Sequence, residues 1–326
     1  MAEAPPFVHR VRRFGESLGP HASELDRDVA AVRTAALDFQ SQGLNILGSP
    51  RVELGSVESF ECLASLAEFS GSFAFLALQQ WVANLNYGDR GETVWPRLTV
   101  AFGHLRNPQS PSPTWSEGRA SGTVPWMTGA GIVERTFLGV RGPEGDERYV
   151  WVSARSRHGF RVMPRRGLLA CDGAANAAVE LRDLPVKESS FVRISRKGAL
   201  ARGDAQSTVW HTPLMIGCGR ASLRLIEASS RIDGEPVRRV RESFEALQSE
   251  ILAAIGEGVS ARKGMRLRSR ASAASVRLAS LACLAHGGQS LAPGHPAGRL
   301  YREAMVYRLM AQTDALVADA FEAESK

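Results

Sequence analysis

The residues best suited to bind a ligand lie in one run of the chain, from His286 to Thr313. Gly287 and Gly288 form a predicted turn, because glycine lets the backbone approach a bound molecule closely. The helical pattern that follows carries Arg299 and Arg302. A guanidinium group is a fixed donor for phosphate or carboxylate. The run therefore predicts a turn and a helix that could face an anionic ligand.

The hydrophobic pattern divides the chain into three zones that must position this run. Residues 1–94 carry apolar side chains at helical spacing, with Gly71 separating two helices. Residues 95–196 are rich in β-branched and aromatic residues, and the Gly-Pro-Glu-Gly turn at 142–145 predicts a hairpin. Residues 197–326 return to helical spacing. This order predicts an α+β fold with an N-terminal helical domain, a middle antiparallel β domain and a C-terminal four-helix-type bundle.

Composition narrows the class of protein. The chain has 326 residues, of which 44% are hydrophobic and 23% charged, as is usual for globular proteins. The longest apolar run, residues 73–82, is too short to span a bilayer, and the first residues lack the apolar core of a signal peptide. We therefore expect a cytoplasmic protein without a membrane span. The net charge of +6 would suit an anionic ligand, but the arginine-rich segments 238–241 and 262–270 are interpreted as solvated helix faces and not as nucleic-acid sites.

Motifs for metal binding and for nucleophilic catalysis are missing from the sequence. The cysteines lie far apart, without a Cys-x-x-Cys spacing, so we predict no metal site and no disulfide framework. Each stands beside apolar or small residues and is interpreted as a core residue. They are Cys62, Cys171, Cys218 and Cys283. The sequence also has no Ser-His-Asp constellation, His-Glu-x-x-His motif or phosphate-binding loop.

The run from 286 to 313 resembles the C-terminal segment of the acyl-CoA dehydrogenase superfamily. In that family a Gly-Gly turn, a proline, an Arg-x-x-Arg and a terminal Gly-Thr recur in this order, and the fold runs from helices to sheet to helices. The resemblance implies a flavin, FAD, bound near an interface between the C-terminal helices of a homodimer or homotetramer. It assigns Gly287, Gly288, Gln312 and Thr313 to the cofactor site.

A second resemblance lies in residues 118–131, which are similar to the strand in which the family's Trp-x-Thr meets the flavin. Trp126 and Thr128 take these positions. An indole can shield one face of the isoalloxazine, and a hydroxyl can donate to its electron-accepting edge. The alternative is a core tryptophan and an edge-strand threonine. After the first strand, the family's Thr-Glu-Pro is replaced by a segment with His104 and Arg106, and we assign His104 to the cofactor side.

Two departures from the family concern catalysis and the dinucleotide. The family's catalytic glutamate would fall on Ala311, which cannot remove a proton. Some members place the glutamate at the start of the first C-terminal helix, where this chain has His211, a competent general base. The alternative for His211 is a hydrogen-bonding role at that helix start. The family's Arg-x-x-Phe-Gly motif, which reaches a neighbouring subunit's dinucleotide, is reduced to Arg231.

Three functions follow as hypotheses. The first is an FAD-dependent oxidoreductase that acts on a small molecule, with acyl thioesters among the candidates but an ordinary fatty acyl-CoA disfavoured by Ala311. The second is a flavin-dependent monooxygenase of the same fold, in which loss of the glutamate is expected because no α-proton is removed. The third is a non-catalytic binding or assembly protein on the same scaffold, which the shortened segment at Arg231 favours.

Overall fold

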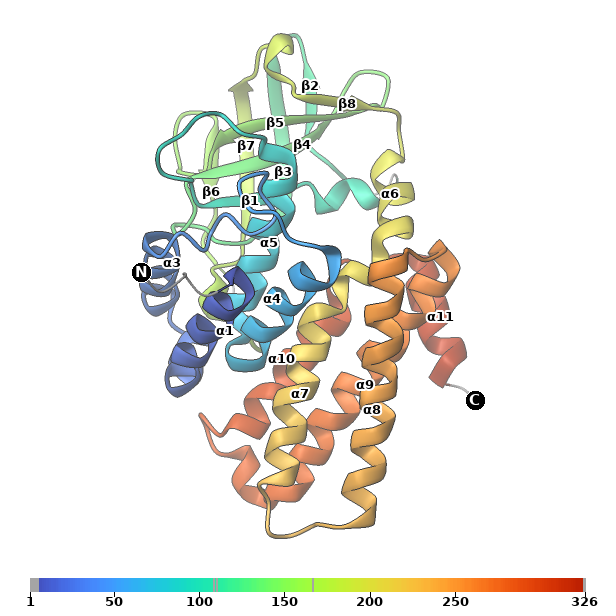
Figure 1. Cartoon of the computed structure of the whole chain (residues 1–326). Helices are drawn as coiled ribbons and strands as arrows, with labels where there is room; N and C mark the ends of the chain where they lie inside the picture. The colour runs from blue at the N-terminus through green and yellow to red at the C-terminus, as the bar shows by residue number, and fades with distance from the viewer. Residues whose placement is uncertain (1–5, 108, 110, 166, 325–326) are drawn as a thin grey trace.

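A computed structural model describes residues 6–324 of the chain apart from 108, 110 and 166. The sheet lies at one end of the molecule and the long C-terminal helices at the other, with the N-terminal helices beside their junction (Figure 1). The chain runs from helices (α1 to α5) through strands (β1 to β8) to helices (α6 to α11), which is the order that the sequence predicted. The predicted fold class is therefore confirmed.

The N-terminal helices form the centre of the main hydrophobic core. Helices α4 and α5 are buried on most sides, so apolar residues occupy nearly all of their turns. The helix break predicted at Gly71 is confirmed, since Ser70 lies between the two helices and its hydroxyl accepts from Phe73 N at 3.4 Å. The elements are α1 (Phe7–Leu18), η1 (Gly19–His21), α2 (Ala22–Leu25), α3 (Val29–Ser41), α4 (Ser56–Phe69) and α5 (Gly71–Tyr87).

The middle zone is a sheet with the strand order β6-β7-β3-β2-β4-β5-β8, and β1 pairs with β4 off this path. The hairpin predicted at 142–145 is confirmed by the antiparallel β4–β5 pair. The sheet is mostly antiparallel, as predicted, but β1 and β2 each pair with β4 in parallel. The strands are β1 (Leu98–Ala101), β2 (Thr114–Ser116), β3 (Arg119–Met127), β4 (Arg135–Arg141), β5 (Glu147–Ser153), β6 (Phe160–Val162), β7 (Ala177–Pro185) and β8 (Arg193–Ser195). The short helices η2 (Gly103–Arg106), η3 (Asp172–Ala174) and η4 (Glu188–Ser190) lie in the connections.

The C-terminal helices pack around α9, which contacts α7, α8, α10 and α11, while α7 also packs against α4. Helical spacing of apolar residues therefore predicted this zone correctly. The elements are α6 (Ala199–Ser207), η5 (Thr208–His211), α7 (Pro213–Glu227), α8 (Glu235–Glu257), α9 (Ala261–His286), η6 (Gly287–Leu291), α10 (Pro296–Leu309) and α11 (Asp314–Glu324).

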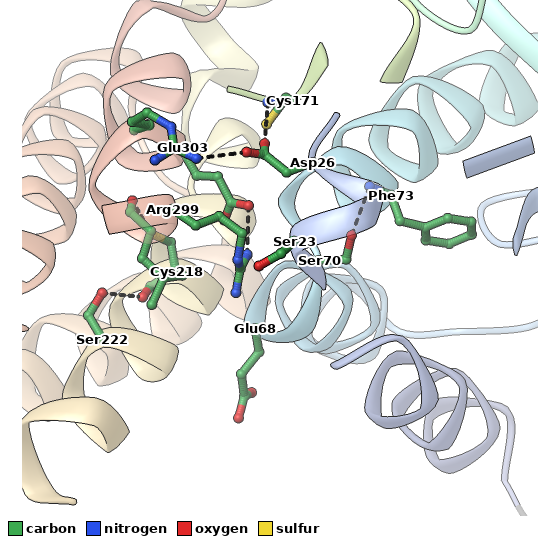
Figure 2. Close-up of polar contacts among 12 residues, drawn as sticks. Ser23, Asp26, Glu68, Ser70, Phe73, Cys171, Cys218, Ser222, Arg299 and Glu303 are labelled. Atoms are coloured by element: carbon green, nitrogen blue, oxygen red, sulfur yellow. Dashed lines mark hydrogen bonds and ion pairs between the residues drawn. The ribbon is translucent and has the colours of Figure 1, made fainter. Parts of the chain in front are cut away.

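The arginines of α10 form ion pairs inside the protein. Arg299 donates to the Glu303 carboxylate at 2.6 Å, and both side chains are buried. Arg302 donates to Asp26 at 2.9 Å. The same carboxylate accepts from Cys171 N at 2.7 Å (Figure 2). The prediction that these two arginines face an anionic ligand was therefore wrong, because carboxylates of the same chain hold both of them.

The next features concern membrane spans, cysteine pairing and metal sites in the described part of the chain. No helix there has the length and apolar character needed to cross a membrane. The four cysteines are unpaired thiols, and three of them are buried. The residues described include no group of three side chains that could hold a metal ion.

Candidate functional site

A cavity of about 1190 Å³ lies between the sheet and the helices. Its walls come from α4, α5, β1, β3 and β8, from η2, α6 and η5, and from the C-terminal part of α10 with the turn that follows. Binding pockets for small molecules usually measure about 300–1,000 Å³. This cavity is therefore large enough for a cofactor and a second ligand.

Trp126 lies on the cavity wall, near the end of β3. Its side chain is 44% exposed although an indole is usually well covered. Its Nε1 donates to the Thr128 hydroxyl at 3.3 Å, and that hydroxyl donates to Asn176 Oδ1 at 2.7 Å. Thr128 is fully buried and does not line the cavity. The indole is therefore available to a ligand, while the one hydroxyl proton of Thr128 is already used by Asn176.

His104 lines the cavity from η2, directly after β1. Its Nε2 lies 3.0 Å from the Gly139 carbonyl oxygen, so we assign the proton to Nε2. The other ring nitrogen, Nδ1, is then a buried acceptor, and it has no partner among the described residues. Burial lowers the pKa of His104 to about 4. The imidazole is therefore neutral near pH 7, with a lone pair left for a ligand.

His211 lines the cavity from η5. Its Nδ1 lies 3.2 Å from the Thr208 carbonyl oxygen, so Nδ1–H is the donor and Nε2 is the acceptor. Burial, followed by the positive charges of Arg268 and Arg106, lowers the pKa of His211 well below 6.5. The structure thus places a neutral histidine that can accept a proton at the position that the sequence suggested for a base.

The turn after α10 forms another part of the wall, through Met310, Ala311 and Gln312. The backbone of Ala311 has φ +49°, which is unusual for a residue with a Cβ. The turn is held by Arg268 of α9, which donates to the carbonyl oxygens of Met310 and Ala311 and to the Thr208 hydroxyl. Burial lowers the pKa of Arg268 to about 10. The interpretation of residues 262–270 as a solvated face was therefore wrong for Arg268, although Arg262, Arg266 and Arg270 are exposed.

Gln312 and Thr313 have different environments. Gln312 lines the cavity, and its Nε2 donates to the Arg308 carbonyl oxygen, while its Oε1 is buried without a partner among the described residues. Thr313 does not line the cavity. Its hydroxyl accepts from Leu316 N at 3.4 Å at the start of α11. Gln312 can therefore meet a ligand in the cavity, whereas Thr313 has a capping role.

Gly287 and Gly288 lie at the far end of α9 from the cavity. Helix α9 has 26 residues, which corresponds to roughly 39 Å, and Arg268 near its start contacts the cavity turn. Gly287 has φ +63°, and Arg231 lies so close to it that a Cβ would collide with the guanidinium group. The structure thus brings Arg231 and Gly287 together. It does not bring either glycine to the cavity of its own chain.

The charges on the cavity wall are mostly positive. Among the described lining residues Asp204 is the only carboxylate, and it forms an ion pair with Arg106. Arg193 also lines the cavity and forms no ion pair in the described part of the chain. No free carboxylate is therefore available on this wall to remove a proton from a ligand.

Two tryptophans from distant segments form an aromatic wall that sequence reasoning missed. Trp81 of α5 and Trp210 of η5 stack with their ring centroids 4.8 Å apart, and both line the cavity. In the sequence, Trp81 is one residue of the apolar run 73–82. Its partner could not be identified, because the stack joins residues 129 positions apart.

Comparisons with known proteins bear on the fold. No protein-family model and no curated protein matches the sequence. Butyryl-CoA dehydrogenase from Megasphaera elsdenii has a similar structure, with a TM-score of 0.76 at 14% identity over 100% of both chains. Nitrososynthase from Micromonospora carbonacea var. africana has a TM-score of 0.77 at 17% identity, over 99% of this chain and 97% of that one.

A third similar structure is dibenzothiophene monooxygenase from Paenibacillus sp. A11-2, in complex with FMN and indole. Its TM-score is 0.73 at 13% identity, over 97% of this chain and 96% of that one. The chain therefore has the acyl-CoA dehydrogenase fold, as the sequence resemblance predicted. This fold is shared by flavin-dependent dehydrogenases and monooxygenases, and at these identities the likeness concerns the fold alone.

Proposed function

We propose that the protein is a flavin-dependent oxidoreductase that binds the isoalloxazine ring in the cavity, against Trp126. The observation that carries the proposal is the indole itself, which is exposed on the wall of a cavity large enough for a flavin and a substrate. Two buried acceptors without partners, His104 Nδ1 and Gln312 Oε1, also lie on this wall. Unsatisfied buried polar atoms call for a partner, and the N–H group of a flavin ring is a suitable one.

Among flavin reactions, the cavity favours monooxygenation over acyl-CoA dehydrogenation. Dehydrogenation of an acyl thioester requires a base for the α-proton, and the only carboxylate on the described wall is held by Arg106. Monooxygenation has no such requirement. A bound flavin would supply two electrons from its reduced form for the activation of oxygen. The general alternative is a flavin dehydrogenase that uses His211 as its base.

His211 and His104 would handle protons in either reaction. Both imidazoles are neutral near pH 7, because burial lowers their pKa values. Each presents one unprotonated nitrogen, so each can accept a hydrogen bond or a proton from a ligand. His211 is our candidate catalytic residue, and His104 is our candidate for contact with the cofactor. Trp126 would cover one face of the flavin and exclude water from it.

The choice between FAD and FMN depends on whether the protein can bind the adenosine part of FAD. The sequence resemblance implies FAD, with Gly287 and Gly288 in the cofactor site and Arg231 as the remnant of the motif that reaches a neighbouring subunit's dinucleotide. In one chain these residues lie far from the cavity, so they could contact an FAD only from a second copy in a homodimer or homotetramer. FMN has no adenosine part and would need no such contact. We therefore propose FAD in an oligomer, with FMN as the alternative cofactor.

Flavin uptake tests this function. Purified protein is incubated with FMN or FAD and passed through a desalting column, and the visible spectrum of the protein fraction is recorded. We expect one of the two flavins to be retained. A colourless fraction after both incubations would contradict the oxidoreductase and would favour a binding or assembly role for the scaffold. Mixing the reduced, flavin-loaded protein with oxygen then separates the two reactions, since rapid reoxidation indicates an oxygenase and slow reoxidation a dehydrogenase.

A further inference from the structure

Arg193, the first residue of β8, presents a guanidinium group on the cavity wall, and no carboxylate of the described residues pairs with it. Its Nη1 donates to Asn86 Oδ1 at 3.2 Å, and its Nε is buried without a hydrogen-bond partner among the described residues. The other lining arginine, Arg106, is paired with Asp204. An unpaired cation with unused donors is a natural contact for an anion, because charge-assisted hydrogen bonds are the strong ones.

The surroundings of Arg193 hold its guanidinium group in a fixed orientation. The group lies over the Tyr149 ring, 3.8 Å from the centroid, and Tyr149 itself stacks on Phe137. On the other side, Asn86 donates from Nδ2 to the Val82 carbonyl oxygen at 2.9 Å, and this leaves Oδ1 as the atom that faces Arg193. A guanidinium group that is stacked and hydrogen-bonded before binding loses little freedom when it binds an anion.

Arg193 and Trp126 lie far apart along the sheet. In the sheet order, β8 is four strands away from β3, which corresponds to about 19 Å at the usual spacing between strands. Both residues nevertheless line the same cavity. A ligand that contacts Arg193 therefore extends well beyond a ring packed on Trp126, or is a second molecule beside it.

We propose that Arg193, positioned by Asn86 and Tyr149, binds a carboxylate or phosphate group of a molecule held in this cavity. The anion has two possible sources, the phosphate of the flavin or an acidic group of the substrate. The proposal deepens the function proposed above, on which it rests for the identity of the site. Apolar side chains also line the cavity near Tyr149, namely Val82 and Leu200, so a substrate that uses this contact is an organic acid with an apolar body.

Two pairs of probes test the contact, each pair differing in one anionic group. FMN and riboflavin differ by the phosphate, and 2-naphthoate and 2-naphthamide differ by the carboxylate. Calorimetry gives the dissociation constant of each probe for the flavin-free protein, so the naphthalene pair does not depend on flavin binding. The variants are Arg193→Gln, which removes the charge, and Arg193→Lys, which keeps it. Arg135→Gln is the control, because Arg135 also lies over a tyrosine ring of this region but does not line the cavity.

In at least one pair, we expect the unchanged protein and Arg135→Gln to bind the anionic probe with a dissociation constant roughly 10- to 100-fold lower than that of the neutral probe. This is the range for a hydrogen bond to a charged group. Arg193→Gln should abolish that preference, and Arg193→Lys should keep part of it. Loss in the FMN pair identifies the flavin phosphate, and loss in the naphthalene pair identifies the substrate acid. No preference in the unchanged protein, or an equal preference in Arg193→Gln, would overturn the proposal.

Thermal unfolding of each variant verifies that it is folded. Failure of both flavins to bind would count against the oxidoreductase while leaving the naphthoate comparison intact.

Discussion

The guanidinium group of Arg268 donates to the carbonyl oxygen of Ala311 at 3.3 Å and thereby fixes the turn that borders the cavity. Arg268 is buried and forms no ion pair among the described residues. A buried cation without a counter-ion is costly, and here its charge also lowers the pKa of His211. A positive charge therefore lies behind the position at which the sequence resemblance would place a catalytic carboxylate.

Removing this charge should make His211 easier to protonate. We expect Arg268→Met to raise the pKa of His211 toward 6.5, because the repulsion between the two cations disappears while the burial remains. NMR titration of the His211 ring would measure the shift. Arg270→Met is the matched control, since Arg270 is exposed on the same helix and pairs with Glu250. An unchanged His211 pKa in Arg268→Met would contradict this electrostatic coupling.

If His211 accepts a proton during turnover, its replacement should slow the reaction without releasing the flavin. We expect His211→Ala to lower kcat/KM roughly a hundredfold or more. Because the pKa of His211 is lowered, the activity of the unchanged enzyme should stay level from neutral pH down into the acid range. His158→Ala, at an exposed position outside the cavity wall, serves as the control. Equal kcat/KM for His211→Ala and the unchanged enzyme would remove His211 from the mechanism.

Burial of His104 should make the protein less stable as the pH falls. The pKa of His104 is lowered from 6.5 to about 4 in the folded state, so between these values the unfolded chain binds more protons. The free energy of unfolding therefore decreases as the pH is lowered through this range. The loss of unfolding free energy reaches about 3 kcal/mol below the pKa of His104 in the folded state, and it is absent above the pKa of the unfolded chain. Urea unfolding of His104→Gln between about pH 5 and pH 7 should show a flatter dependence. His158→Gln, at an exposed position, should retain the slope of the unchanged protein.

The buried pair of Arg299 and Glu303 should matter for folding and not for ligand binding (Figure 2). We expect Arg299→Met to lower the free energy of unfolding by about 3–5 kcal/mol, because it leaves a buried carboxylate without a partner. The double variant Arg299→Met/Glu303→Leu should recover most of the loss. Arg238→Met, in an exposed pair with Glu242, should cost less than about 1 kcal/mol. Urea unfolding measures all three, and a double variant as unstable as Arg299→Met would contradict this account.

Local sequence rules predicted the elements that depend on neighbouring residues. The break at Gly71 follows from a Ser-Gly pair between apolar runs, and the hairpin at 142–145 follows from its glycines and proline. The family resemblance singled out Trp126 within a short motif, and the structure places this residue on the cavity wall, while its contact with a flavin stays a prediction. These features could be predicted because a few adjacent residues determine each of them.

Contacts between distant segments could not be predicted in the same way. Arg268 was interpreted as part of a solvated face because its neighbours in sequence are basic, yet the turn at Ala311 covers it. The hydroxyl of Thr128 donates to the side-chain oxygen of Asn176, which lies 48 positions further along the chain. Arg193 meets Asn86 only because β8 and α5 border the same cavity. Periodicity indicates that a side chain is buried, but tertiary packing decides what covers it.

The proposed contact between Trp126 and a flavin can be tested directly. FMN or FAD is titrated into the protein, and the flavin fluorescence is recorded. Binding should quench this fluorescence, because an indole that covers the isoalloxazine ring is an efficient quencher. We expect Trp126→Leu to bind the same flavin roughly tenfold or more weakly, as for the loss of a stacked aromatic partner, and with less quenching. Phe321→Leu is the control, because Phe321 is an exposed aromatic residue outside the cavity wall. Equal affinity and equal quenching for Trp126→Leu and the unchanged protein would contradict the placement of the flavin in this cavity.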